Sequence, residues 1–200
     1  MLYWWRLFAS DVDANKNAHR SINPHTVSQT LTLAIMTTQS NTSDQLFLLD
    51  TREDLQEHLL NMLEKGRKEI AIFSHKLDPV LFNNDAISAA ISRVARSSHT
   101  SKVRIAIEQP QALVESNHQI LSLAQRLVSK ISIQKISVEP QDGYQFVIVD
   151  RDKLWLQHSE EHFTGFANYD ARPEVKRFLA IFNELWKYSE EDTRLRVLSL

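Results

Sequence analysis

The sequence predicts an α/β protein in which one mixed β-sheet is flanked by helices. Two observations on residues 46–189 lead to this class. Short apolar runs, partly β-branched, alternate along the chain with longer segments whose apolar residues recur at helical spacing. Strands that alternate with helices are typical of a sheet packed against helical layers. The chain has 200 residues, 42% of them hydrophobic, which suffices for the core of one ordinary domain.

The first predicted element is a helix over residues 52–65. Either Asp50 or Thr51 can cap its start, since each is followed within one turn by an acidic residue that completes a capping box. Gly66 follows the helix, and glycine is the residue that most readily takes the left-handed conformation that ends one.

The later elements follow the same two patterns. Apolar runs predict strands at residues 69–73, 102–107, 131–138, 146–149 and 153–157, the last two forming a hairpin. Amphipathic segments predict helices at residues 86–95, 110–128 and 175–186. Phe178, Phe182 and Trp186 share one face of the last helix. Such a stripe is typical of a buried face, and the alternative is an exposed contact with another subunit.

The two ends of the chain differ from this middle part. Residues 15–43 are rich in Asn, Thr, Ser and Gln, a composition that orders poorly by itself. We therefore expect a poorly ordered extension over residues 1–45, a folded domain over residues 46–189 and a charged tail over residues 190–200. Met36 precedes a polar stretch that resembles a bacterial N-terminus, so translation from Met36 is one hypothesis for the extension. The alternative is an anchor built on Trp4, Trp5 and Phe8.

The composition excludes several classes of protein. The three glycines stand apart at positions 66, 143 and 165, whereas nucleotide-binding loops cluster theirs around the phosphates. The absence of cysteine excludes disulfides and thiolate metal sites. A net charge of −2 argues against a broad nucleic-acid surface, so we do not expect nucleic acid as a partner. No apolar run reaches the ~20 residues that span a bilayer, and we expect a cytoplasmic protein without a membrane span.

Polar residues follow the first predicted strand. His75 and Lys76 come directly after it, and the carboxyl ends of strands in such sheets are where ligands bind. Both side chains can bind an anion, and Asp78 could orient the imidazole of His75. The alternative is an ordinary solvated loop. His118, in the third predicted helix, is expected to be a partly buried histidine that is bonded to its neighbours.

A short zinc-binding pattern follows the predicted hairpin. The segment His158-Ser159-Glu160-Glu161-His162 matches H-x-x-E-H. Its position after a strand differs from the helix that this pattern normally occupies, and motifs of this length arise easily by chance. We therefore expect no resident metal and no cofactor, and interpret the segment as a polar loop. His158, Glu161 and His162 remain secondary candidates for adventitious zinc or nickel.

A family resemblance involves the fourth predicted strand. Residues 143–150 resemble the H-x-K-x-x-x-x-D motif of the phospholipase D superfamily, whose aspartate is matched by Asp150 at the end of an apolar strand. Residues 165–168 take the place of the family's G-S-x-N turn and keep its glycine and its asparagine, Asn168. The order of elements over residues 51–189 is also similar to one half of a phospholipase D. The resemblance implies a single phospholipase D-like half.

Two departures from that motif change the expected chemistry. Gly143 stands where the family has its nucleophilic histidine, and glycine has no side chain that could attack phosphorus. Gln145 stands where the family has a lysine, and a neutral amide stabilises developing charge less well. We therefore expect no catalytic residue in this motif. Candidate ligands for an anion are Gln145, Asp150 and Asn168, together with His75 and Lys76.

Three hypotheses of function follow. The first is a catalytically inactive phospholipase D-like module that binds an anionic ligand or a protein. The second is a hydrolase, phosphodiesterase or metal-dependent, that works through histidines outside the motif, namely His75, His118, His158 or His162. The third is nucleic-acid binding through Lys102, Arg104, Lys130 and Lys135. We rank it last because the alternation of side chains along strands divides these four between two faces.

The resemblance also implies partners. A phospholipase D active site joins two halves, so a single half predicts a symmetric homodimer. The chain is similar to bacterial phospholipase D-like domains of unknown function, some of them attached to acyltransferase domains. An acyltransferase is therefore a candidate partner.

Overall fold

A computed structural model describes residues 46–136, 144–158 and 162–195 of the chain. The strands are β1 (Leu46–Leu49), β2 (Glu69–Ser74), β3 (Lys102–Ile107), β4 (Ile131–Lys135), β5 (Gln145–Val149), β6 (Lys153–Gln157) and β7 (Gly165–Asn168). The helices are α2 (Arg52–Glu64), α3 (Pro79–Phe82), α4 (Asp85–Arg96), α5 (Gln111–Glu115), α6 (Gln119–Arg126) and α7 (Arg172–Lys187), followed by a 3-10 turn, η2 (Thr193–Leu195).

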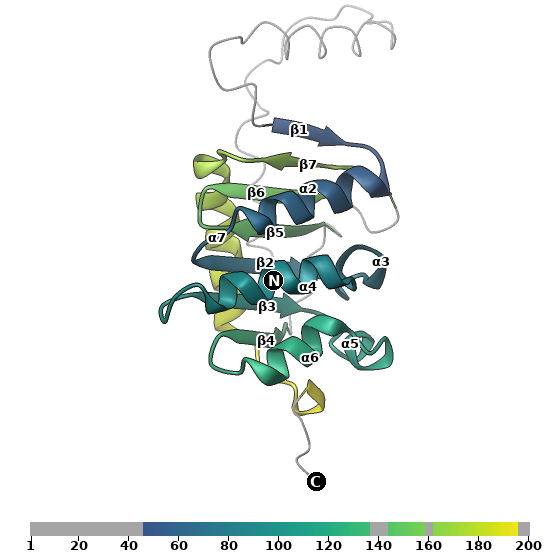
Figure 1. The fold of residues 1–200 in the computed structure, drawn as a ribbon, viewed down its shortest axis with the longest axis vertical. Helices are drawn as coiled ribbons and strands as arrows, with labels where there is room; N and C mark the ends of the chain where they lie inside the picture. Colours follow the sequence, from purple (N-terminus) through teal and green to yellow (C-terminus); the bar gives the residue numbers. More distant parts are fainter. Residues whose placement is uncertain (1–45, 137–143, 159–161, 196–200) are drawn as a thin grey trace, which may run out of the picture. The chain divides into compact units, whose positions relative to one another are not determined.

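The strands form one seven-stranded sheet in the order β1-β7-β6-β5-β2-β3-β4 (Figure 1). β2, β3 and β4 are parallel, and β5, β6, β7 and β1 extend the sheet with antiparallel pairing. Helices α2, α4 and α6 cover one face, and α7 crosses the other (Figure 1). The predicted class, a mixed sheet flanked by helices, is confirmed.

The core has one apolar layer on each face of the sheet. Under α2, α4 and α6, the largest buried side chain is Trp155, whose ring nitrogen donates to the Leu55 carbonyl at 3.0 Å. Under α7, Phe182 is fully buried, and Phe178 and Trp186 pack partly buried against the same layer. The aromatic stripe of the last helix therefore belongs to the core, as the more ordinary of its two interpretations predicts.

Two strands and a helix break were not anticipated. β1 and β7 are only four residues each, too short for alternation to stand out in the sequence. The predicted helix over residues 110–128 is divided into α5 and α6. The division lies at Asn117, whose φ of 47° is incompatible with a continuous right-handed helix.

The start and the end of α2 have different explanations. Thr51 is the N-cap, because its hydroxyl accepts from the Asp54 amide at 3.1 Å. The expectation that Gly66 ends the helix in the left-handed conformation is wrong. Lys65 caps the end with φ −79°, and Gly66 has no positive φ. A close approach explains Gly66 instead, since a Cβ there would lie 2.8 Å from Cγ1 of Val149.

Within the described part of the chain, no helix combines the length and the apolar character that crossing a membrane requires.

Candidate functional site

The topology brings the ends of several strands to two opposite edges of the sheet. β2 pairs parallel with β3 and antiparallel with β5, so Ser74 lies beside Ile107 and near Gln145. We call this the carboxyl edge, because the parallel strands end there. The opposite edge, where Glu69 and Lys102 begin their strands, is called the amino edge.

A row of buried polar side chains, joined by hydrogen bonds, lies at the carboxyl edge. The Ser74 hydroxyl donates to Oε1 of Gln145 at 2.6 Å, and Nε2 of Gln145 donates to Oε1 of Gln157, also at 2.6 Å. Nε2 of Gln157 donates to the His162 carbonyl at 3.3 Å, and the Leu77 amide donates to the Ser74 hydroxyl at 2.9 Å. All three side chains, of Ser74, Gln145 and Gln157, are buried. Their polar groups satisfy one another, as burial requires.

A histidine and a carboxylate pair on the outer side of the same edge. His75 follows β2 and Glu108 follows β3, and Nδ1 of His75 is hydrogen-bonded to the Glu108 carboxylate. The His75 carbonyl also accepts from the amides of Glu108 and Gln109, at 3.1 and 2.9 Å. The His75 side chain is 42% exposed and that of Glu108 only 12%. A carboxylate on Nδ1 fixes the ring and leaves Nε2 as the atom for a ligand or a proton.

The expected partner of His75 was Asp78, and this expectation is wrong. The carboxylate of Asp78 accepts from the Val80 amide at 2.9 Å and caps α3. Glu108 takes its place because parallel strands end side by side. The sequence contained a usable signal, since Glu108 follows its strand just as His75 follows the preceding one. Lys76 lies half-buried in the same turn as His75.

Asp150 lies at the amino edge, where it caps backbone groups. Its carboxylate accepts from the amides of Arg67 and Lys68, both at 2.7 Å, and of Glu69 at 3.0 Å. Because β5 runs antiparallel to β2, the end of β5 lies beside the beginning of β2. The sequence left open whether Asp150 lines a pocket or closes a strand, and the structure places it as a cap.

Asn168 is also distant from the carboxyl edge. Residues 165–168 form strand β7 rather than a turn, and Asn168 is paired with Leu154 near the beginning of β6. Its side-chain oxygen accepts from the Asp170 amide at 3.0 Å. Of the five candidate ligands, the structure therefore groups His75, Lys76 and Gln145 and places Asp150 and Asn168 at the opposite edge. Gly143 lies outside the described residues.

The prediction that His118 is bonded to its neighbours is confirmed, but the residue is more deeply buried than expected and precedes helix α6. It is fully buried, and its Nδ1 accepts from the Ile120 amide at 3.2 Å as the N-cap of α6. Burial lowers the pKa of His118 to about 4, and the Leu77 carbonyl and the Asp78 carboxylate oppose this shift without cancelling it. The imidazole is therefore neutral at pH 7.

The zinc-binding pattern is only partly described. His158 and His162 are both exposed, and Glu161 lies outside the described residues. Over residues 46–136, 144–158 and 162–195, no group of three His, Cys, Asp or Glu side chains is placed to hold a metal ion. Their role as adventitious ligands stays a prediction.

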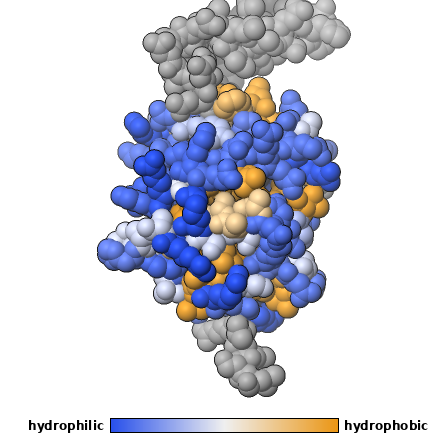
Figure 2. Space-filling model, viewed as in Figure 1, coloured by the Kyte–Doolittle hydropathy of each residue, from blue (hydrophilic) through white to orange (hydrophobic). Residues whose placement is uncertain are grey.

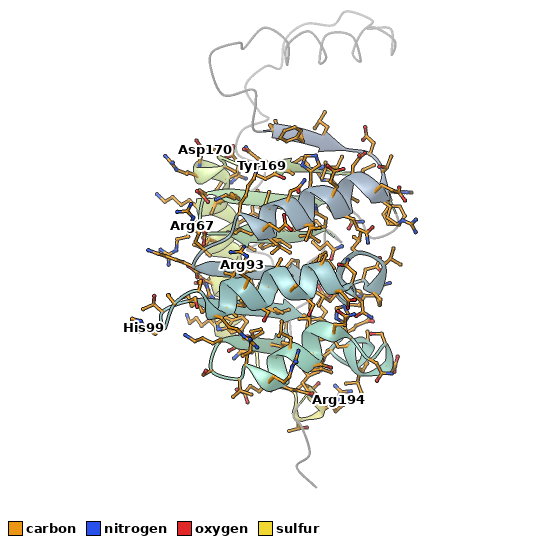
Figure 3. The ribbon with its side chains drawn as sticks, in the orientation of Figure 1. Arg67, Arg93, His99, Tyr169, Asp170 and Arg194 are labelled. Carbon is orange, nitrogen blue, oxygen red and sulfur yellow. The ribbon has the colours of Figure 1, made fainter. Side chains whose placement is uncertain are left out.

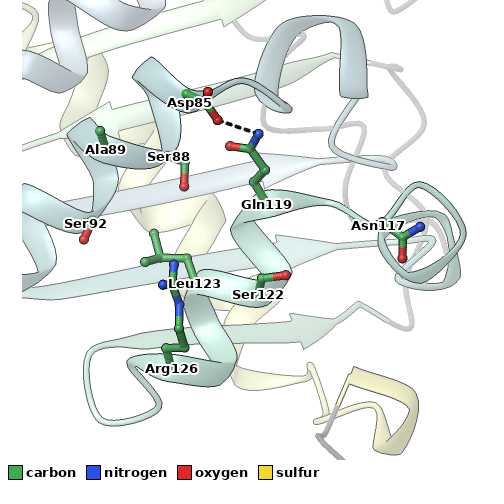
Figure 4. A pocket seen from close by; sticks show the side chains of 9 residues that line it. All are labelled: Asp85, Ser88, Ala89, Ser92, Asn117, Gln119, Ser122, Leu123 and Arg126. Carbon is green, nitrogen blue, oxygen red and sulfur yellow. Dashed lines mark hydrogen bonds between the residues drawn. The ribbon is translucent and has the colours of Figure 1, made fainter.

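A polar groove lies between α4 and α6, away from the five candidate ligands (Figure 4). Its volume is about 410 Å³, and Asp85, Ser88 and Ser92 line it from α4. Gln119 and Arg126 line it from α6, and Nε2 of Gln119 donates to Asp85 at 2.9 Å. The groove thus contains one acidic side chain, Asp85, and one basic side chain, Arg126.

Comparison of the sequence with protein families finds one match. The profile of a family described as "Domain of unknown function (DUF7931)" matches residues 51–198. The chain belongs to the DUF7931 family. No curated protein matches it significantly.

Solved structures identify the fold of this DUF7931 domain. It is similar to Nuc, a phospholipase D family member from Salmonella typhimurium, with a TM-score of 0.56 and 12% identity over 76% of this chain and 98% of Nuc. It is similar to phosphatidylserine synthase from Haemophilus influenzae, with a TM-score of 0.51 and 9% identity over 73% of this chain and 37% of that one.

A further match is TrmBL2, described as an archaeal chromatin protein with a novel mode of DNA binding. Its TM-score is 0.55, with 16% identity over 84% of this chain and 61% of TrmBL2. At these identities the likeness concerns the fold alone. The phospholipase D-like fold is therefore confirmed.

Proposed function

We propose that this DUF7931 domain is a phospholipase D-like binding module without phosphodiesterase activity at the family's site. The observation that carries the proposal is the buried chain from Ser74 through Gln145 to Gln157. Gln145 stands at the position of the family's lysine, and both ends of its amide are engaged by neighbours. This neutral amide, with its oxygen and one of its two N–H donors already bonded, stabilises charge on a phosphoryl oxygen less well than a lysine would.

The sequence supports the same proposal at the nucleophile position. Gly143 has no side chain, so the covalent step of the family has no attacking atom there. No other lysine replaces the family's lysine in this row of buried polar side chains, which are one serine and two glutamines.

The ligand that we propose is a small anion bound at the outer side of the carboxyl edge. His75 is held by Glu108 and is still partly exposed, and Lys76 follows it in the same turn. An imidazole N–H and an ammonium group are donors that suit phosphate or carboxylate oxygens. A protein partner that presents a carboxylate or phosphate group would use the same donors.

Two measurements test this proposal. Hydrolysis of bis(4-nitrophenyl) phosphate is expected to be no faster than with heat-denatured protein. Titration with inorganic phosphate, followed by the NMR signals of the imidazole protons, is expected to shift those of His75 in a saturable manner. Lys76→Gln should weaken that shift, and His58, on helix α2, gives the control signal. Turnover that disappears in Gln145→Ala would contradict the proposal.

A hydrolase that uses the His75–Glu108 pair is the second candidate function. A carboxylate that orients a histidine is the arrangement by which enzymes build a general base. Turnover that is lost in His75→Ala and Glu108→Ala but retained in Gln145→Ala would favour this candidate.

Partners and domain division remain proposals. The homodimer rests on the joining of two halves in phospholipase D sites, and the acyltransferase partner rests on the resemblance stated above. The extension over residues 1–45 and the tail over residues 190–200 likewise stay predictions. TrmBL2 shares the fold and is described by its DNA binding, which gives reason to test nucleic acid, a partner that the net charge of −2 argued against.

A further inference from the structure

The amino edge gathers basic side chains from four separate loops. These loops precede β2, β3 and β4 and follow β5. The basic residues in them or at their ends are Arg67, Lys68, Arg96, Lys102, Lys130 and Arg151. Arg67, Arg93 and His99 mark this edge in Figure 3, on the side where these loops emerge. Figure 2, in the same view, shows strongly hydrophilic residues over this region.

Hydrogen bonds tie these loops into one surface. Asp150 accepts from the amides of residues 67–69, and the Lys68 carbonyl accepts from the Lys102 amide at 3.0 Å. The Ser97 hydroxyl donates to the Arg67 carbonyl. Lys130 donates through Nζ to the carbonyls of Ser98 and His99, at 2.9 and 2.6 Å. The folded backbone therefore fixes where these basic residues are attached.

The carboxylates among these loops face inward. Asp150 is engaged by three backbone amides. Glu69, 11% exposed, accepts from Arg104 at 3.1 Å and from Arg151 at 3.0 Å, with Lys102 at 3.4 Å. Burial raises the pKa of Glu69, but the Arg151 hydrogen bond and the surrounding positive charges outweigh it, so the carboxyl stays ionised at pH 7.

Three further acids flank the amino edge. Asp152 pairs with Lys153 at 2.7 Å, Asp170 pairs with Arg172 at 3.3 Å, and Glu64 is exposed at the end of α2. Together with Glu69 and Asp150 they are fewer than the basic side chains of the same loops. The amino edge is thus positively charged on a chain whose net charge is −2.

We propose that the amino edge binds the phosphate backbone of duplex nucleic acid. This goes beyond the function proposed above, which concerns the opposite edge. Cations attached to several ordered loops suit a row of phosphates, and their contacts position a duplex without reading its sequence. Single-strand binding needs exposed aromatic rings for stacking, and the exposed aromatics of the described residues, Phe47 and Tyr188, belong to β1 and to the end of α7.

A lipid surface fits this edge less well. Membrane-binding segments insert several apolar side chains between lipid headgroups. Among the described residues of these loops, Val128 is the one large apolar side chain that is exposed. The remaining exposed groups are polar or charged.

The test compares two double variants that remove the same charge. Arg67→Gln/Arg96→Gln changes the amino edge, and neither side chain has a hydrogen bond or an ion pair with another described residue. Arg52→Gln/Lys135→Gln is the control, because both residues lie toward the carboxyl edge. Binding is measured by fluorescence anisotropy on a labelled DNA duplex of about 20 base pairs, from about 50 to about 200 mM salt.

The wild-type chain is expected to bind the duplex with an affinity that falls steeply with salt. In the amino-edge variant, affinity near 0.1 M salt should fall about tenfold or more. The slope of log affinity against log salt concentration should also become shallower, by the equivalent of about two phosphate contacts. The control variant should bind like the wild type. Absence of salt-dependent binding, or an equal loss in both variants, overturns the proposal. So does binding to phosphatidylserine vesicles without binding to the duplex.

Discussion

At the scale of single residues, Gln145 links the fold to the proposed loss of activity. Its amide lies between the Ser74 hydroxyl and Gln157, with 2.6 Å hydrogen bonds on both sides. A lysine at this position would place an ammonium group where the described hydrogen bonds come from a serine and a glutamine and from no carboxylate. Burial of an unpaired charge is among the most destabilising changes that a core can receive.

The substitution Gln145→Lys is therefore expected to destabilise the protein. We expect a loss of about 2 to 4 kcal/mol in the free energy of unfolding at pH 7, measured by urea denaturation. The loss should shrink as the pH rises, because burial favours the neutral amine. Gln109→Lys, at an exposed position of the same edge, is the matched control and should be nearly neutral. Equal stability of both variants would contradict the buried polar chain.

His118 makes a prediction of pH dependence. The folded protein keeps this imidazole neutral to about pH 4, whereas the unfolded chain binds the proton near pH 6.5. The unfolded state then binds more protons between these values, so stability is full above pH 6.5 and falls as the pH drops toward 4. The decrease attributable to His118 should approach about 3 kcal/mol.

His118→Asn should remove this part of the pH dependence. Asparagine can still accept from the Ile120 amide as an N-cap and does not titrate. Between pH 7 and pH 4, the unfolding free energy of the wild type should fall by about 3 kcal/mol more than that of the variant. Parallel curves would show that His118 does not titrate in this way. His99→Asn, at an exposed loop position, is the control.

At the scale of elements, β7 depends on one glycine. A Cβ on Gly165 would lie 2.1 Å from the Leu156 carbonyl oxygen, which belongs to the backbone of β6. The clash cannot be relieved by rotating a side chain. At Gly66 the nearest atom is a methyl group of Val149, which can shift more easily.

Gly165→Ala is expected to cost more stability than Gly66→Ala. The first must separate β7 from β6, and overpacking of this kind costs about 1 to 3 kcal/mol or more. The second should cost less, because a side chain can yield. Urea denaturation of both variants measures the difference, and the reverse order would contradict the pairing of Gly165 with Gln157.

At the scale of the whole molecule, the two edges of the sheet have different characters. The carboxyl edge carries the His75–Glu108 pair beside buried amides, and the amino edge carries an excess of basic side chains. The sheet also ends in β1, a short strand whose Leu46, Phe47 and Leu48 are exposed. The aromatic side chains of α7, considered earlier for a dimer contact, pack into or against the core.

A homodimer remains a prediction for the whole molecule. We expect size-exclusion chromatography with light scattering to give a dimer mass at about micromolar concentration, because a single phospholipase D half leaves the shared face of that fold without its partner. A monomer mass at that concentration would contradict the prediction. The measurement is independent of whether the chain binds phosphate or duplex DNA.

The sequence by itself determined the elements with strong periodicity and the identity of single residues. The apolar faces of α2, α4 and α7 and the runs of β2, β3 and β5 are local patterns, and each predicted element formed. The absence of a side chain at Gly143 and of a charge at Gln145 is equally local. Short edge strands and the break at Asn117 could not be predicted, because neighbours rather than their own periodicity stabilise them.

Only the tertiary structure decided which candidate residues meet. Gln145 and Asp150 lie at the two ends of β5, and an extended strand separates its ends by about 3.3 Å for each residue. The direction of β5 relative to β2 then placed Gln145 beside Ser74 and Asp150 beside Glu69. Strand direction arises from long-range pairing, which no local pattern encodes. For the same reason, the pairing of His75 with Glu108 and the gathering of basic loops at the amino edge appear only in the folded chain.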